Sequence, residues 1–234
     1  MTDRLADAVG NLFALGGPVV AILVLLSVFA LAMILLKAGQ FLRERVGAGG
    51  RTERALDAWA QRRDGEARAL VERDPSPAGA ALALVFARMG AADADRQAIE
   101  EEAARLATVR LHALQRGLRA LDAIAQTAPL LGLFGTVLGM IDAFQALQSA
   151  GSVVDPSMLA GGIWVALLTT AVGLGVAMPV SLAVTVFETR IENERVAIET
   201  TTGAALARRP SATAVPGAAE AAAAPQREAA GHAA

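Results

Sequence analysis

The sequence predicts an all-α membrane protein with three transmembrane helices and long helical extensions in the cytoplasm. Two observations lead to this prediction. First, 54% of the 234 residues are hydrophobic, while the formal net charge is only -2. Second, the apolar residues gather in nearly uncharged stretches, because residues 8–36 and 156–187 contain no acid or base and residues 123–154 contain only Asp142. Uncharged stretches longer than about 18 residues are typical of helices that cross a membrane.

The composition argues against an enzyme or a metal protein. The chain has no cysteine, which excludes disulfides, zinc–thiolate sites and a cysteine nucleophile. Of its two histidines, His112 is a lone residue on a basic helix and His232 lies near the end of the chain, so a multi-histidine metal centre is not expected. The 23 acidic and 21 basic residues nearly balance, which gives no reason to expect a nucleic-acid partner. We therefore expect no enzymatic activity and no cofactor.

The first elements are an N-terminal segment, residues 1–18, and a transmembrane helix, residues 19–36. A cleaved signal peptide is not expected, because the apolar run is too long for a signal core and the residues before it lack a net positive charge. Pro18 is expected in the first turn of the helix, where proline is tolerated.

Residues 37–127 form the predicted cytoplasmic helical domain, since their richness in Ala, Leu, Arg and Glu favours helix. Clusters of glycine and proline at 47–50 and 74–77 predict breaks in the helical structure. The helices expected between and after these breaks cover residues 51–73, 79–89 and 93–127.

The last of these predicted helices carries an apolar stripe with alternating spacings of three and four residues. Such spacing is typical of a seam that packs against another helix. The stripe leads into the next apolar stretch, so we expect one continuous helix from the cytoplasm into the membrane. We interpret the stripe as plain core in preference to a docking surface. Its members are Leu111, Leu114, Leu118, Leu121 and Ala125.

Two further transmembrane helices follow. Because about 20 residues cross a hydrocarbon core of about 30 Å, residues 128–148 form the second span, and residues 159–187 form a third that tilts or projects beyond the bilayer. The loop between them, residues 149–158, is short. A cytoplasmic helix extension is expected at 188–202. Residues 203–234 are dominated by alanine with scattered proline and charge, and are expected to be a disordered tail.

The basic residues predict the orientation of the three spans. Lysine and arginine cluster after the first and third spans and are absent from the loop at 149–158. By the positive-inside rule, the N-terminus and this loop lie outside the cytoplasm, and the domain at 37–127 and the C-terminus lie inside.

Small residues mark the second and third spans. They let helices approach closely in lipid, so ordinary helix packing is the first interpretation of these residues. Threonines lie beside them at positions 136, 169 and 170. The residues assigned to helix packing are Gly132, Gly135, Gly139, Gly173 and Ala177.

Two stretches of sequence indicate a family through their actual residues, beyond the spacing of their small residues. APLLGLFGTVLGM at residues 128–140 closely resembles a signature of the MotA/TolQ/ExbB proton channel family, and of its ExbB/TolQ branch in particular. GIWVALLTTAVGL at residues 162–174, followed by Ala-Met-Pro at 177–179, resembles the third span of that branch. The resemblance covers about residues 123–193 at the level of motifs, and the rest of the chain by its layout.

The resemblance implies an inner-membrane subunit of an energy transducer driven by ion flow. Members of this branch form pentamers whose second and third spans surround a central pore. A single-span ExbD-like or TolR-like partner, with a titrating aspartate, lies inside. The work is passed to a TonB-like or TolA-like protein, and serves TonB-dependent import or Tol-type envelope maintenance. A multi-pass protein of the bacterial inner membrane is therefore expected, with residues 1–18 and 149–158 in the periplasm.

The inventory of polar residues agrees with this expectation. An intramembrane proton relay needs a titratable group, and the central portions of the three predicted spans contain none. The essential acid must then come from another polypeptide. Thr136 and Thr170 match the pore-facing threonines of the family, so we predict that they form a polar lining. Thr169 is a weaker candidate, because the family often has alanine there.

The chain departs from the family at one position. Relatives commonly carry glutamate where this sequence has Val165. Asp142 could partly replace the missing charge as a vestibule group that attracts cations, although an interfacial carboxylate without a specific role is the favoured interpretation. The departure supports an alternative function, a non-conducting membrane scaffold of the same fold that organises envelope proteins. Proton or sodium as the driving ion, and a TonB-type or Tol-type system, both stay open.

Overall fold

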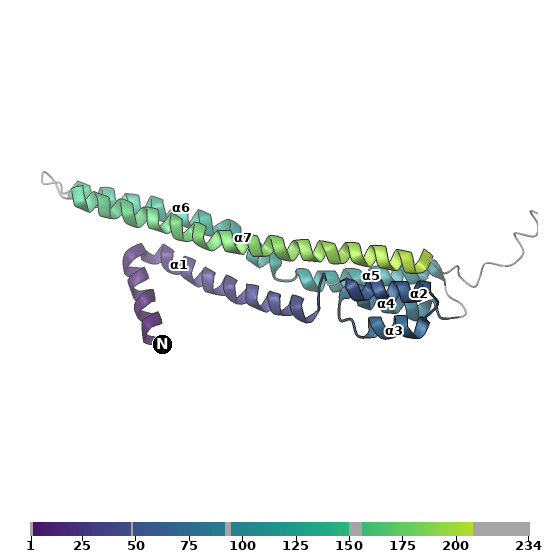
Figure 1. Ribbon diagram of the computed structural model, residues 1–234. Helices are drawn as coiled ribbons and strands as arrows, with labels where there is room; N and C mark the ends of the chain where they lie inside the picture. Colours follow the sequence, from purple (N-terminus) through teal and green to yellow (C-terminus); the bar gives the residue numbers. More distant parts are fainter. Residues whose placement is uncertain (1, 48, 92–94, 150–155, 208–234) are drawn as a thin grey trace, which may run out of the picture. The chain divides into compact units, whose positions relative to one another are not determined.

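Helices make up all the regular structure in the described parts of the chain. The computed structural model describes residues 2–47, 49–91, 95–149 and 156–207. The helices in these ranges are α1 (Thr2–Arg43), α2 (Gly50–Ala60), α3 (Asp64–Glu72), α4 (Pro77–Arg88), α5 (Arg96–Gln115), α6 (Leu118–Ser149) and α7 (Pro156–Ala207), as Figure 1 shows.

Three stretches of helix are long and apolar enough to cross a membrane. They are Gly17–Arg43, Arg96–Ser149 and Leu159–Ala207, and each contains one of the predicted spans. The prediction of an all-helical protein with three candidate spans is therefore confirmed for the described residues.

The chain forms two compact units. Unit 1 contains Met1–Val46 and Leu111–Asn193, and unit 2 contains Gly47–Arg110 and Glu194–Ala234. Because each unit combines two separate stretches of sequence, its core is built from residues far apart in the chain.

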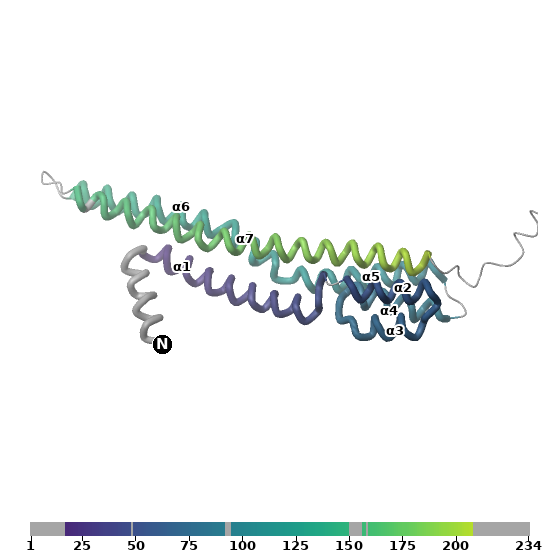
Figure 2. The backbone as a smooth tube through the Cα atoms, viewed as in Figure 1, coloured from purple at the N-terminus to yellow at the C-terminus, as the bar shows by residue number. Residues whose placement is uncertain are grey.

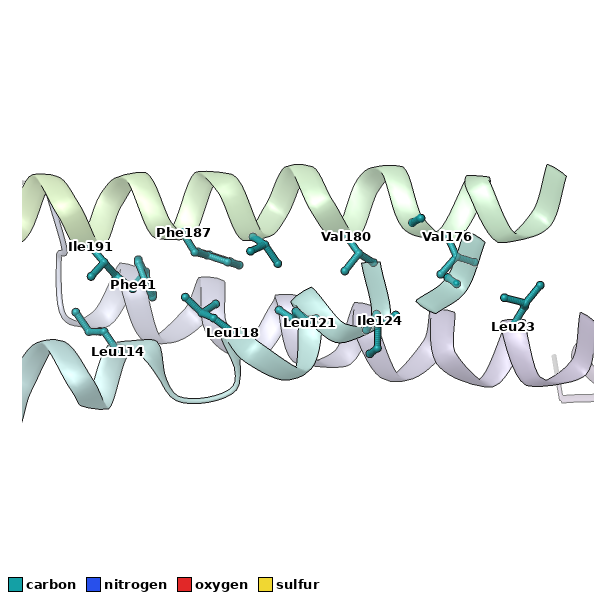
Figure 3. Close-up of a cluster of buried hydrophobic side chains, with 14 of the residues drawn as sticks. Leu23, Phe41, Leu114, Leu118, Leu121, Ile124, Val176, Val180, Phe187 and Ile191 are labelled. Carbon is teal, nitrogen blue, oxygen red and sulfur yellow. The ribbon is translucent and has the colours of Figure 1, made fainter. Parts of the chain in front are cut away.

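The core of unit 1 lies where α1, α5, α6 and α7 meet (Figure 3). The rings of Phe41 and Phe187 are 4.9 Å apart at an angle of 50°. The stripe predicted at 111–125 belongs to this core, either buried or packed against it, so its interpretation as plain core is confirmed. The labelled members of the cluster are Leu23, Phe41, Leu114, Leu118, Leu121, Ile124, Val176, Val180, Phe187 and Ile191.

A break separates α5 from α6, so the prediction of one continuous helix over 93–127 is wrong. The backbone of Gly117 has a φ of 82°, which side-chain-bearing residues rarely adopt. A Cβ atom on Gly117 would also lie 3.0 Å from the Met33 Cε of α1. Lys37 of α1 donates a hydrogen bond from Nζ to the Leu114 carbonyl oxygen, 3.0 Å away, and so caps the last turn of α5.

The start of the first span agrees with the sequence. Gly17 has non-helical backbone angles (φ 65°, ψ -166°), and Pro18 follows it. Because proline lacks an N–H, it fits the first turn of the helical segment that begins there.

Unit 2 is built around the stacked rings of Trp59 and Phe86, whose centroids are 4.3 Å apart. The helix predicted over 51–73 is divided, because α2 ends at Ala60 and α3 begins at Asp64. Arg62, with a φ of 59°, lies in the turn between them. Tertiary packing thus overrides a sequence that favours helix throughout this region.

The helix of the third span continues further than expected. α7 ends at Ala207, beyond residue 203, the predicted start of the tail. The reason is burial, because Ala205 and Leu206 are 0% and 2% exposed in the core of unit 2. The rest of the predicted tail, 208–234, and most of the predicted periplasmic loop, at 150–155, lie outside the described residues.

Candidate functional site

The pairing of α6 with the first half of α7 builds the candidate site. The two helices run antiparallel and side by side (Figures 1 and 2), with small residues at their contacts. A Cβ atom on Gly132 would lie 3.0 Å from the Thr169 carbonyl oxygen, and one on Gly139 would lie 3.0 Å from the Ala166 Cβ. A Cβ on Gly173 would lie 2.6 Å from the Ala128 carbonyl oxygen. These contacts form the seam between the helices, and they leave no space for larger side chains.

Thr169 lies inside the seam. It is 2% exposed, and its single O–H proton is shared between the carbonyl oxygens of Gly132 on α6, at 3.1 Å, and of Ala166 on its own helix, at 2.7 Å. A Cβ on Gly135 would lie 2.6 Å from the Thr169 Oγ1. The hydroxyl therefore faces the neighbouring helix, and this position suits packing better than the lining of a lumen.

Thr136 and Thr170 share one side of the seam. Gly135 of α6 packs against Thr169 of α7. Thr136 directly follows the first of these residues, and Thr170 directly follows the second. Each step of one residue advances about 100° around a helix. In an antiparallel pair, the two residues that directly follow a facing pair therefore lie on the same side of the seam. The two threonines are thus neighbours that differ in height by about two residues, or roughly 3 Å. We call this side of the pair the threonine face.

The other side of the seam is covered by α1. Leu131 and Val172 each precede a seam glycine by one position, so both lie opposite the threonine face. Both are partly buried against the core that contains Leu23 and Ala30 of α1. Within unit 1, therefore, α1 packs on one side of the α6–α7 pair and the threonines lie on the other.

The two hydroxyls of the threonine face differ in their hydrogen bonds. The Thr136 hydroxyl donates to the Leu133 carbonyl oxygen of its own helix, at 2.6 Å. The Thr170 Oγ1 is buried and has no hydrogen-bond partner among the described residues. A buried hydroxyl without a partner is costly, so a water molecule beside the helices would stabilise this atom.

Val165 and Asp142 lie away from the threonines. Val165 precedes Ala166 and Asp142 precedes Ala143, so both are on the side of the seam that α1 occupies further along the helices. The Asp142 side chain is exposed. The two positions share a side and differ in height by about two residues, or roughly 3 Å.

The threonine face continues along α7 through two residues that were not predicted as site residues from the sequence. Ser181 is about three turns beyond Thr170, and Glu188 is about two turns beyond Ser181, so all three point the same way. Ser181 and Glu188 are exposed in the chain. Sequence reasoning missed Ser181 because it treated residues 159–187 as uniformly apolar, and missed Glu188 because it begins the predicted cytoplasmic extension. The helical spacing of the two residues from Thr170 was a usable signal.

Two hollows lie along this face. The first is a groove bordered by Ala125 and Pro129 of α6 and by Ala177 and Ser181 of α7. The second, of about 550 Å³, lies where α6 begins and is lined by Arg119, Asp122, Glu188 and Glu192 among others. Three carboxylates and one guanidinium give this second hollow a net negative charge.

Comparison with known proteins agrees with the arrangement of the helices. The sequence profile of the MotA/TolQ/ExbB proton channel family matches residues 77–200, which is more than half of the chain. The chain belongs to this family. Its membership confirms the resemblance of the two strings in α6 and α7, and identifies a membrane subunit of ExbB/TolQ type.

Proteins named ExbB and proteins named TolQ both match parts of the chain. The biopolymer transport protein exbB1 of Vibrio cholerae is 46% identical over 68 residues, covering 29% of this chain and 30% of that protein. A putative ExbB homolog of Methanothermobacter thermautotrophicus is 39% identical over 100 residues (43% and 35%). The Tol-Pal system protein TolQ of Haemophilus influenzae is 40% identical over 73 residues (31% and 32%). The chain thus matches about a third of the length of each relative.

Proposed function

We propose that the chain is the ExbB/TolQ-like subunit of an ion-driven motor in the bacterial inner membrane. The observation that carries this proposal is the threonine face, because Thr136 and Thr170 meet on the side of the α6–α7 pair that α1 leaves uncovered. In a homopentamer of the family type, this face lines the central pore, and α1 lies toward the lipid. Thr169 packs α6 against α7.

The titrating acid of the motor is supplied by another protein. Within the three predicted spans Asp142 is the only ionisable residue, and it lies on the side of the seam opposite the threonines. Hydroxyl groups do not ionise usefully at physiological pH. The partner is therefore a single-span ExbD-like or TolR-like protein whose aspartate reaches the threonine face, where the two threonines form a polar lining for that carboxylate or its water.

The cytoplasmic half of the ion route follows the same face. Ser181, and then the acidic hollow near Glu188 and Asp122, continue the line that begins at Thr170. Negative charge at this end attracts cations and gives a released proton a place to go. The positive-inside rule puts this end in the cytoplasm and the N-terminus in the periplasm.

The motor performs work on the cell envelope through a TonB-like or TolA-like protein. Relatives named ExbB and TolQ both match the chain, so sequence similarity does not decide between the two systems. The neighbouring genes decide which system the chain serves. A gene for a single-span protein with an intramembrane aspartate, next to a TonB-like or a TolA-like gene, identifies the system.

A second candidate function is a non-conducting scaffold, which Val165 favours because relatives commonly carry glutamate there. The scaffold keeps the helical bundle and organises other envelope proteins. Partner-dependent proton flux separates the two functions, since a scaffold conducts no ions.

Cysteine accessibility tests the assignment of the pore face. The chain contains no cysteine, so single cysteines at Thr136, Ser181 or Leu131 can be labelled in membranes with a water-soluble thiol reagent. The proposal predicts labelling at Thr136→Cys and Ser181→Cys, and protection of both by co-expression of the partner. Leu131→Cys, on the side that α1 covers, is the matched control and should label slowly. Equal labelling at all three positions would contradict the assignment.

A further inference from the structure

Glu194 is a buried carboxylate on α7 that the pore does not use. It is 2% exposed, and its two oxygens accept hydrogen bonds from two backbone N–H groups of unit 2. The Gly47 N–H donates to Oε2 at 2.6 Å, and the Ala78 N–H donates to Oε1 at 2.9 Å. Burying a carboxylate is costly unless its oxygens are hydrogen-bonded, and here each oxygen has a donor.

One of these bonds completes the start of α4. The first N–H groups of a helix have no partner within it, and Pro77 has none to offer. Ser76 accepts from the Gly79 N–H at 3.0 Å, and Asp74 accepts from the Ser76 N–H at 3.1 Å. The Ala78 N–H has no local cap and depends on Glu194. The negative charge also suits the positive end of the α4 dipole.

The other bond holds the turn that follows α1. Arg45 has a φ of 50° and Gly47 a φ of 81°, so this turn uses backbone conformations that are rare for ordinary residues. Such conformations persist when surrounding contacts hold them. The bond to Glu194 is one such contact, and it joins the turn to a residue 147 positions away in the sequence.

The same face of α7 is also held by apolar contacts. Ala205 lies about three turns beyond Glu194, and with Leu206 it is buried in the core around Trp59 and Phe86. The carboxylate is therefore the polar end of a longer contact between α7 and the rest of unit 2.

We propose that Glu194 is a positioning residue, a latch that fixes the rotation and height of α7 against α4 and the Gly47 turn. The functional consequence rests on the function proposed above. Glu194 and Thr170 lie on the same helix, because α7 runs over Pro156–Ala207. Opening the latch disturbs coupling in the motor while the α6–α7 seam stays intact.

Glu194→Gln tests the latch directly. Glutamine has the same size but only one acceptor oxygen, and its NH₂ group would face one of the two donors. In the full-length oligomer, hydrogen exchange should rise roughly tenfold or more in the segments containing Gly47 and Ala78, because bonds to charged groups are the stronger ones. Exchange in the α6–α7 seam should not change. Glu199→Gln is the matched control, since Glu199 is exposed on the same helix and 3.7 Å from Arg195. Unchanged exchange in Glu194→Gln, or an equal rise in the control, would overturn the proposal.

A crosslink keeps the test decisive if Glu194→Gln fails to assemble. In this cysteine-free chain, Glu194→Cys with Ala78→Cys should be joined by a short bifunctional thiosulfonate, whereas Glu199→Cys with Ala78→Cys should not. Joining the first pair should restore partner-dependent proton flux that the unjoined pair lacks, which a loss of stability alone would not produce. Absence of the crosslink, or flux that is independent of it, would refute the latch. If the proposed function itself is wrong, no variant will show flux, while the exchange result at Gly47 and Ala78 will still stand.

Discussion

At the scale of single residues, the fit between α6 and α7 depends on missing side chains. The closest approach to a backbone atom is at Gly173, where an added Cβ would meet the carbonyl oxygen of Ala128 at 2.6 Å. At Gly135, the group in the way is the Thr169 side chain. Backbone cannot rotate away as a flexible side chain can, so substitution at Gly173 should be poorly tolerated.

Gly173→Ala should therefore force the helices apart and lower the free energy of unfolding by about 1–3 kcal/mol, the usual cost of overpacking. Gly175→Ala on the same helix is the control, because nothing lies within 4 Å of its added Cβ. It should be neutral or stabilising by up to ~1 kcal/mol, since alanine favours helix. Unfolding of the two purified variants in detergent gives the comparison, and equal stability would contradict the described seam.

Thr169→Val should remove the hydrogen bond between the helices without changing the size of the side chain. We expect a loss of about 0.5–1.5 kcal/mol in the free energy of unfolding. Thr200→Val is the control, because the exposed Thr200 hydroxyl bonds only to carbonyl oxygens of its own helix. The same unfolding measurement checks both variants, and an equal effect would show that the bond to Gly132 contributes nothing.

At the scale of whole elements, the break between α5 and α6 determines where the second span begins. Gly117 supplies the left-handed backbone of the break, and α1 packs against it through Met33. Lys37 then caps the last turn of α5. Contacts from α1 thus help to fix the point at which α6 begins.

Gly117→Ala should strain this break, because alanine in the left-handed region costs roughly 1–2 kcal/mol and its methyl group would crowd Met33. Gly39→Ala is the matched control, since Gly39 lies inside α1 with nothing within 4 Å of an added Cβ. We expect a lower melting temperature for the first variant and not for the second. If both melt as the parent protein does, the break does not depend on glycine.

The elements differ in how far the sequence predicted them. The spans were predictable because hydrocarbon excludes charge, which leaves long uncharged stretches in the sequence. The breaks at Arg62 and Gly117 were not, because a single residue with positive φ leaves little trace among strong helix formers. The start of the tail differed from the prediction for a similar reason, since the burial of Ala205 and Leu206 depends on residues far away in the chain.

The candidate site was predictable only in part. The strings around Thr136 and Thr170 indicated the family, but the side of the helix pair on which each residue lies follows from the contacts of the seam. Those contacts separate Thr169 from Thr170, although the two are adjacent in sequence. Glu194 was missed because a charged residue on a helical extension is usually solvated.

At the scale of the whole molecule, the distribution of charge fits the proposed motor only if a second polypeptide supplies the titrating acid. Within the predicted spans, the threonine face carries hydroxyl groups but no acid. Its carboxylates lie in the acidic hollow near the start of α6. A motor built on this chain therefore depends on the carboxyl group of its partner. The first property to measure is proton movement in the presence and absence of that partner.

Measuring partner-dependent proton flux in proteoliposomes is the most direct test of the proposed motor function. A pH-sensitive dye inside the vesicles should report flux only when the chain and its single-span partner are both present. The double variant Thr136→Val and Thr170→Val should assemble normally and lose at least about tenfold in rate, within the range of contributions from positioned proton-transfer groups. Thr127→Val, an exposed threonine of α6 whose hydroxyl bonds to the Ala123 carbonyl oxygen, should keep the parent rate. Full flux in the double variant, or flux without the partner, would contradict the account.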